Sequence, residues 1–105
     1  MINVSKYKTI AGAAKGLAKA LNKLGYEGAV ALTPEVAEDY GYGKGWAVVC
    51  ESVPYEGMVL LSMGESMYCE PWVGPYDGKP EINLMGNDNW YAEPYNSYVM
   101  CFGTC

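Results

Sequence analysis

Reactive chemistry in this sequence would have to come from carboxylates or thiols, because its 105 residues include no histidine and no arginine. Without histidine there can be no Ser-His-Asp triad, no Cys-His pair and no imidazole metal ligand. Without arginine there is no bidentate clamp for a carboxylate or a phosphate. Two acids at the right separation suffice for a glycosidase, and five glutamates occur in or near strand-like runs: Glu51, Glu56, Glu65, Glu70 and Glu93. Their spacing selects no pair, so we expect solvated carboxylates, no catalytic residue and no enzyme activity.

The four cysteines lie at positions 50, 69, 101 and 105. A zinc site commonly places about two to four residues between paired cysteines, and only Cys101 and Cys105 approach this, with three residues between them. Cys50 and Cys101 lie inside apolar runs, where a thiol behaves as a small hydrophobe. In a reducing cytosol such thiols stay free, whereas a secreted chain could form two disulfides. We expect free thiols, no metal site and no bound cofactor.

Charge divides the chain at residue 23. Residues 1–23 carry five lysines and no acid, a net charge of +5, whereas residues 24–105 carry two lysines and twelve acids, a net charge of −10. This division predicts a lysine-bearing helix on an acidic body. An acidic body disfavours direct contact with nucleic acid, because single-strand binders need a positive groove. The sequence has no apolar run of membrane-spanning length and no secretory signal, so we expect a cytoplasmic protein without membrane contact.

Aromatic side chains are the second compositional signal, with ten tyrosines, three tryptophans and one phenylalanine. Four of the six prolines directly precede an aromatic residue, at Pro54-Tyr55, Pro71-Trp72, Pro75-Tyr76 and Pro94-Tyr95. Proline fixes its own φ, so each of these rings follows a stiffened backbone. Tyrosine and tryptophan are enriched at interfaces, because they bury a large area at low entropic cost and keep a polar tip. The rings therefore either close the edge of a small core or form an interaction surface.

An amphipathic helix is predicted over residues 9–24, with Thr9 as its N-cap and Gly25 just beyond its end. Gly12 and Gly16, one turn apart, lower the helix propensity. They predict that another backbone approaches closely, so the helix should pack tightly on a sheet. Apolar residues recur at spacings of three and four and form one face: Ile10, Ala14, Leu17, Leu21 and Leu24. Lysines 15, 19 and 23 form a second row away from that face.

Short strands and turns follow this helix. We expect a strand over residues 29–32, then a second short helix that opens at Thr33-Pro34-Glu35 and ends near Gly41. Glycines at 41, 43 and 45 predict a loose connection. The segment lacks the spacing of a phosphate-binding loop, so we expect no phosphate site there. Strand-like runs at 46–53 and 58–63 flank a turn signal and predict a β-hairpin.

The remaining chain is less regular, with a short strand expected near residues 81–85 and a final strand over 98–102. Because no helical crossovers separate the later strands, a parallel α/β sheet is disfavoured. The sequence therefore predicts an α+β fold and a single domain over residues 1–105. Its N-terminal amphipathic helix should pack on an antiparallel β-sheet, with one additional short helix.

Two short motifs carry a resemblance. One is Trp90-Tyr91-Ala92-Glu93-Pro94-Tyr95-Asn96-Ser97-Tyr98-Val99, and the other is Trp46-Ala47-Val48-Val49-Cys50-Glu51 followed by Pro54-Tyr55-Glu56. They resemble the C-terminal stretch and the central hairpin of small uncharacterised proteins from tailed-phage genomes. The ending Gly103-Thr104-Cys105 departs from that pattern. The resemblance implies a small phage accessory protein in the host cytoplasm and transfers no catalytic residues.

We expect a small acidic binding protein that docks on a host macromolecule with a basic surface and inhibits it. The partner would be a protein or nucleoprotein complex of a defence or transcription system, which makes the protein an anti-defence or host-takeover inhibitor similar in role to anti-CRISPR proteins. Charge would set the association rate, and aromatic anchors would supply affinity. The expected contact residues are Glu51, Glu56, Glu70, Trp72, Tyr76, Glu93 and Tyr95. A virion structural or decoration protein and a carboxylate-based enzyme are the alternatives, and the oligomeric state stays open.

Overall fold

The computed structural model describes residues 2–51, 61–62, 82–95 and 98–104. Helix α1 (Ile10–Lys23) forms where the apolar periodicity predicts it. The Thr9 hydroxyl caps it by accepting a hydrogen bond from the Gly12 N–H at 3.1 Å, and Gly25 follows its end with a φ of 97°. Leu17 and Leu21 are fully buried, and the three lysines of the second row are exposed. The predicted helix is confirmed, with its cap and both faces.

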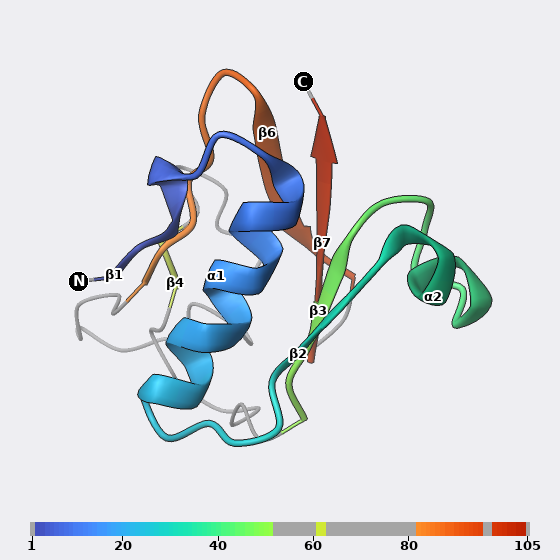
Figure 1. The fold of residues 1–105 in the computed structure, drawn as a ribbon, viewed down its shortest axis with the longest axis horizontal. Coiled ribbons are helices and arrows are strands. Elements are labelled where there is room, and N and C mark those ends of the chain that lie inside the picture. Colours follow the sequence, from blue (N-terminus) through green and yellow to red (C-terminus); the bar gives the residue numbers. More distant parts are fainter. Residues whose placement is uncertain (1, 52–60, 63–81, 96–97, 105) are drawn as a thin grey trace.

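Four strands form an antiparallel sheet beside α1 (Figure 1). Its strand order is β2 (Val30–Leu32), β3 (Ala47–Val49), β7 (Val99–Thr104) and β6 (Trp90–Pro94). The predicted strands at 29–32 and 98–102 are therefore present, each shifted by a residue or two. β6 lies in a stretch that the sequence indicated only as irregular. Residues of β6 alternate between a more buried and a more exposed face, because the strand is held in the sheet by its pairing with β7.

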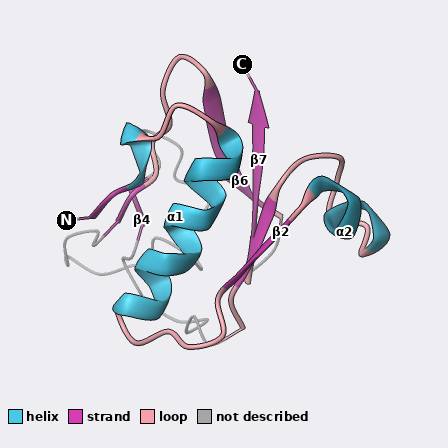
Figure 2. Cartoon of the chain, in the orientation of Figure 1, coloured by secondary structure: helices cyan, strands magenta, loops and turns pink. Residues whose placement is uncertain are grey.

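The short helix α2 (Pro34–Asp39) connects β2 to β3. Pro34 takes its first position and Glu35 lies in its first turn, as the sequence predicts for a helix start. Ala37 is fully buried against Ala47 and Val99 of the sheet. α2 therefore lies on the face of the sheet opposite to α1 (Figure 2).

A second, small sheet has the order β1 (Ile2–Asn3), β5 (Ile82–Asn83) and β4 (Leu61–Ser62), and both of its pairings are parallel. This sheet corrects the predicted hairpin between residues 46–53 and 58–63. Within the described part of the chain, β4 pairs with β5 and does not pair with β3. The reason is that β3 already has β2 on one edge and β7 on the other.

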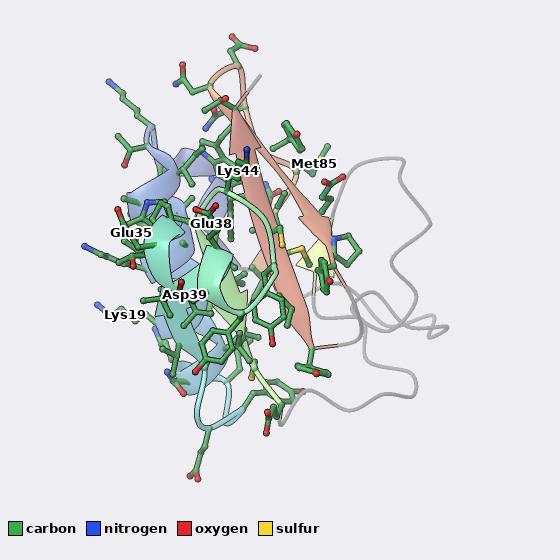
Figure 3. The ribbon with its side chains drawn as sticks, turned by 90° about the vertical axis from the view of Figure 1, so that its right-hand side faces the viewer. Lys19, Glu35, Glu38, Asp39, Lys44 and Met85 are labelled. Atoms are coloured by element: carbon green, nitrogen blue, oxygen red, sulfur yellow. The ribbon has the colours of Figure 1, made fainter. Side chains whose placement is uncertain are left out.

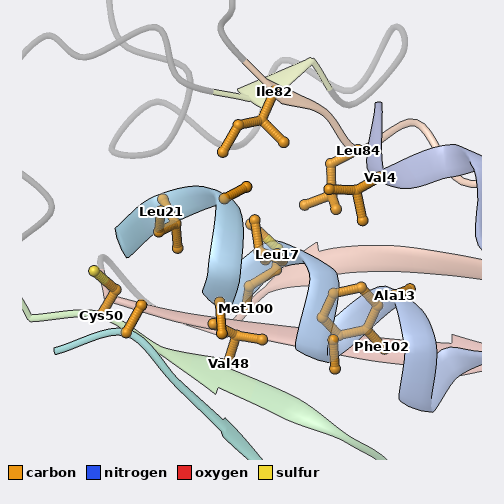
Figure 4. Close-up of a cluster of buried hydrophobic side chains, with 14 of the residues drawn as sticks. Val4, Ala13, Leu17, Leu21, Val48, Cys50, Ile82, Leu84, Met100 and Phe102 are labelled. Carbon is orange, nitrogen blue, oxygen red and sulfur yellow. The ribbon is translucent and has the colours of Figure 1, made fainter. Parts of the chain in front are cut away.

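The main core lies between the two sheets, around α1 (Figure 4). Leu17 and Leu21 of the helix share it with Val48 and Met100 of the large sheet. Ile82 and Leu84 enter the same cluster from the other side. The helix therefore has apolar neighbours on two sides, which explains why its buried face includes alanines as well as leucines. The α+β fold, with an amphipathic helix on an antiparallel sheet and one short extra helix, is confirmed.

The two helical glycines of α1 face an aromatic ring, which corrects the expected close approach of a backbone. A Cβ atom at Gly16 would lie 3.0 Å from Tyr7 Cζ, and one at Gly12 would lie 3.3 Å from Tyr7 Cδ1. The Tyr7 carbonyl is fixed by hydrogen bonds from Trp90 Nε1 at 2.7 Å and Asn87 Nδ2 at 2.8 Å. Because Gly12 and Gly16 have no side chains, the Tyr7 ring can pack directly on the backbone of α1. No helix within the described ranges is long and apolar enough to cross a membrane.

Candidate functional site

The face of the large sheet opposite to α1, here called the outer face, carries the candidate site. Side chains alternate between the two faces of a strand. Val48, Met100 and Phe102 point into the core beneath α1, so their strand neighbours point outward. The registers Val30–Val49–Val99 and Leu32–Ala47–Cys101–Glu93 then place these residues on the outer face. α2 covers one part of this face through Ala37 and leaves the rest uncovered by any described helix.

An open hollow of about 690 Å³ lies on this face beside α2. Its floor is aliphatic, and tyrosines and carboxylates lie around it. The lining residues are Glu27, Gly28, Val30, Leu32, Tyr40, Tyr42, Val49 and Glu51. Figure 3 looks toward α2, which stands in front of the strands and carries Glu38 and Asp39. None of the lysines in the described part of the chain lines the hollow.

Tyr42 is the residue at which the parts of the outer face meet. Its ring stacks on Tyr40 at 5.7 Å between centroids and 17° between planes, and it meets the edge of Tyr95 at 5.3 Å and 63°. Its backbone N–H donates to the Ala37 carbonyl at 2.9 Å, and its carbonyl accepts from Cys101 Sγ at 3.1 Å. Tyr42 is therefore tied to both α2 and β7.

Glycines on both sides of Tyr42 make this placement possible. Gly41 has a φ of 80° and Gly43 a φ of 116°, and other L residues rarely adopt such values. The chain can therefore turn sharply before and after Tyr42 and bring its ring back onto the sheet. In the sequence this segment reads Gly-Tyr-Gly, a pattern that by itself predicts only a loose connection. The repeated glycines around an aromatic residue are the signal that could have located Tyr42.

Two ionisable groups of the outer face bind their protons more tightly than usual. Partial burial raises the pKa of Tyr42 above its ordinary value, and nearby Tyr98, Tyr40, Glu51 and Tyr95 add to the effect. Burial also raises the pKa of the Cys101 thiol, and the neighbouring carboxylate of Glu93 raises it further. At neutral pH the phenol and the thiol are therefore uncharged, and Cys101 is a poor nucleophile.

The lysines of α1 and the acids of the outer face lie on different sides of the sheet. Glu51 lines the hollow, and Glu93 lies on the outer face opposite Cys101. Three exposed acids belong to α2: Glu35, Glu38 and Asp39. The exposed lysines of α1 lie on the other side of the sheet, where Lys15 Nζ is 5.5 Å from the centre of the Trp46 ring. The predicted division into a lysine-bearing helix and an acidic surface therefore exists in three dimensions.

Three of the predicted contact residues, Glu51, Glu93 and Tyr95, come together around Tyr42. Glu51 contributes to the raised pKa of Tyr42, and the Tyr95 ring contacts the Tyr42 ring. Glu93 contributes to the raised pKa of Cys101, whose thiol donates to the Tyr42 carbonyl. The other four lie outside the described residues: Glu56, Glu70, Trp72 and Tyr76. Tyr40, Tyr42 and Val30 belong to the surface but were not predicted.

Comparison with protein-family models, with curated proteins and with solved structures finds no match. Within the described ranges, no group of three or more Cys, Asp or Glu side chains could hold a metal ion. The two cysteines described are Cys50, which is buried, and Cys101, which is half-buried. Each donates to a backbone carbonyl, Cys50 to Tyr26 at 3.6 Å and Cys101 to Tyr42 at 3.1 Å.

Proposed function

We propose that this chain is a small acidic binding protein, without enzyme activity, that docks through its outer face on the basic surface of a protein partner. The observation that carries the proposal is the combination found there: exposed tyrosines over an aliphatic floor, with carboxylates around them and no described lysine among them. Apolar contact area and negative charge on the same surface favour a partner that is itself apolar and positively charged.

The exposure of the large side chains supports an interface. Tyr40 is 66% exposed, Tyr95 55% and Val30 52%. Tyrosines are among the residues that most often dominate binding energy, because they fill partner pockets at low entropic cost. Glu51 and Glu93 beside them would steer a basic partner and exclude an acidic one.

The charge also limits the kind of partner. Phosphates of a nucleic acid would meet Glu51 and Glu93 as like charges, so we propose a protein, or the protein part of a nucleoprotein complex. A basic protein surface that normally binds nucleic acid would suit the outer face. The motif resemblance to phage proteins supports an inhibitor that acts in the host cytoplasm by covering such a surface.

One observation favours each alternative. The edge strands of the described sheet, β2 and β6, each pair on one side only. Copies of the chain could pair through such edges in a virion lattice. Sedimentation at tens of micromolar separates the readings: a monomer supports the inhibitor, and higher assemblies support the structural protein. Glu27 and Glu51 line one hollow, as a carboxylate enzyme would need. Against that reaction, both residues are exposed to solvent and the hollow is open.

Affinity capture from a bacterial lysate tests the proposal with matched variants. Bait proteins would be the wild type, Glu51→Lys with Glu93→Lys, Tyr95→Ala, and Asp88→Lys as a control. Asp88 is an exposed acid in the loop before β6, and its reversal makes the same change of charge as either one of the two outer-face reversals, at a position that does not line the hollow. A specific partner should be retained by the wild type and the Asp88 variant and lost by the outer-face variants. Equal retention by all four proteins would contradict docking through the outer face.

A further inference from the structure

The hollow beside Tyr42 combines three surfaces that match one kind of side chain. Val30, Leu32 and Val49 provide an aliphatic floor, formed by two strands in register with Val30 opposite Val49. The stacked rings of Tyr40 and Tyr42 stand beside this floor. Glu51 supplies negative charge in the same hollow. An aliphatic stem, a flat cation and a counter-ion would each find a complementary surface.

We propose that this hollow receives an arginine side chain of the protein partner, with its stem along the valines and its guanidinium between the tyrosine pair and Glu51. The proposal rests on the proposed function, because it specifies what the outer face recognises on a basic surface. Arginine is favoured over lysine because the planar guanidinium stacks on aromatic faces and is less strongly hydrated than an ammonium group. A neutral side chain of the same shape could still donate hydrogen bonds to Glu51, but it would lose the attraction between opposite charges.

The structure explains why the hollow stays open to such a ligand. Gly28 lines the hollow with a φ of 82°, a value that favours glycine, and a glycine contributes only backbone to the rim. Tyr42 is held by α2 and by Cys101, so the aromatic wall is in place before binding. A preformed wall lowers the entropic cost of binding. The raised pKa of Tyr42 keeps its phenol uncharged at neutral pH, and its neutral ring presents a negative face to a cation without a fixed charge of its own.

The test uses small probes and NMR of the full chain. Nα-acetyl-arginine methylamide would be titrated to about 50 mM, a range that detects the millimolar affinity expected of a single side chain. The amide signals of Gly28, Val30, Val49 and Glu51 should shift. The citrulline analogue, which has the same shape without the charge, should bind at least about tenfold more weakly, and the lysine analogue should be weaker than arginine.

Matched variants locate the site. Glu51→Gln and Tyr40→Ala should each weaken the arginine probe by about three- to tenfold, since each removes one of the two contacts of the cation. Asp88→Asn should leave binding unchanged. Glu51 and Tyr40 are both exposed, and retained dispersion of the spectrum would show that each variant is folded. The inference would be overturned if the arginine and citrulline probes bound equally well. It would also be overturned if Glu51→Gln and Tyr40→Ala both bound the arginine probe as well as the wild type does.

The result separates this inference from the proposed function. If the arginine probe does not bind while capture of the partner remains sensitive to Glu93→Lys and Tyr95→Ala, arginine recognition is wrong and docking through the outer face stands. If the probe binds in the hollow while every outer-face variant retains the partner as well as the wild type does, the hollow recognises arginine and the proposed function is wrong.

Discussion

At the scale of single residues, Tyr42 decides how the outer face is built. Its ring contacts Tyr40 and Tyr95, and its backbone is bonded to α2 and to Cys101. Glu51, Glu93 and Tyr95 could be predicted from the sequence, because charge and a preceding proline are local properties. Tyr40 and Tyr42 could not, because their importance depends on the two glycines that fold the chain back onto strands near residues 49 and 101.

The thiol of Cys101 provides a residue-scale prediction. Replacing Glu93 with glutamine removes a negative charge that raises the pKa of Cys101, so the thiolate fraction should increase. Alkylation of Cys101 near pH 8, followed by peptide mass spectrometry, should therefore be faster in the variant. Asp88→Asn serves as the control and should leave the rate unchanged. An unaltered rate in Glu93→Gln would show that this carboxylate does not act on the thiol.

A second residue-scale prediction concerns alkaline stability. The pKa of Tyr42 is raised in the folded protein, so the folded state binds this proton more tightly than the unfolded state. The resulting stability is fully present below the unfolded pKa of tyrosine, about 10, and is lost as the pH rises through the folded pKa. In urea titrations at increasing pH, Tyr42→Phe should lose less stability than the wild type over this alkaline range. Parallel curves for the two proteins would contradict the effect.

At the scale of elements, local signals were sufficient for the helices and insufficient for strand pairing. α1 could be predicted because its periodicity, cap and terminal glycine all lie within 17 residues, from Thr9 to Gly25. β6 could not be predicted, since its partner β7 and its buried Trp90 depend on contacts with distant elements. The predicted hairpin was wrong because β7, some fifty residues away in the chain, occupies the edge of β3. Long-range pairing of this kind leaves little trace in a single sequence.

The packing of Tyr7 on α1 gives an element-scale prediction. In an ordinary helix, replacing an interior glycine with alanine stabilises by about 1 kcal/mol. At Gly16 the added Cβ would collide with the Tyr7 ring, so Gly16→Ala should instead destabilise by about 1–3 kcal/mol. The free energy of unfolding from urea titration measures this. In a Tyr7→Ala background the same substitution should become stabilising, and a penalty that persisted there would contradict the steric explanation.

At the scale of the whole molecule, the sheet separates the lysines of α1 from the acids of the outer face. The exposed lysines of α1 lie on one side, and Glu51, Glu93 and the acids of α2 lie on the other. The sequence predicted this separation, because the change of charge coincides with the end of the helix. The outer face then adds what charge alone could not predict: a hollow with aliphatic floor and tyrosine wall. A basic partner would approach on this side and be held by aromatic contacts.

The kinetics of partner binding test this central claim most directly. Association of the captured partner would be measured from about 50 to 500 mM salt, a range over which exposed charges become screened. The wild-type association rate should fall by at least about tenfold, and Glu51→Lys with Glu93→Lys should slow association at low salt. Tyr95→Ala should instead speed dissociation, because anchors that lose water on binding act mainly on the off-rate. An association rate that stays constant over this range of salt, and is unaffected by the charge reversals, would contradict docking through the acidic outer face.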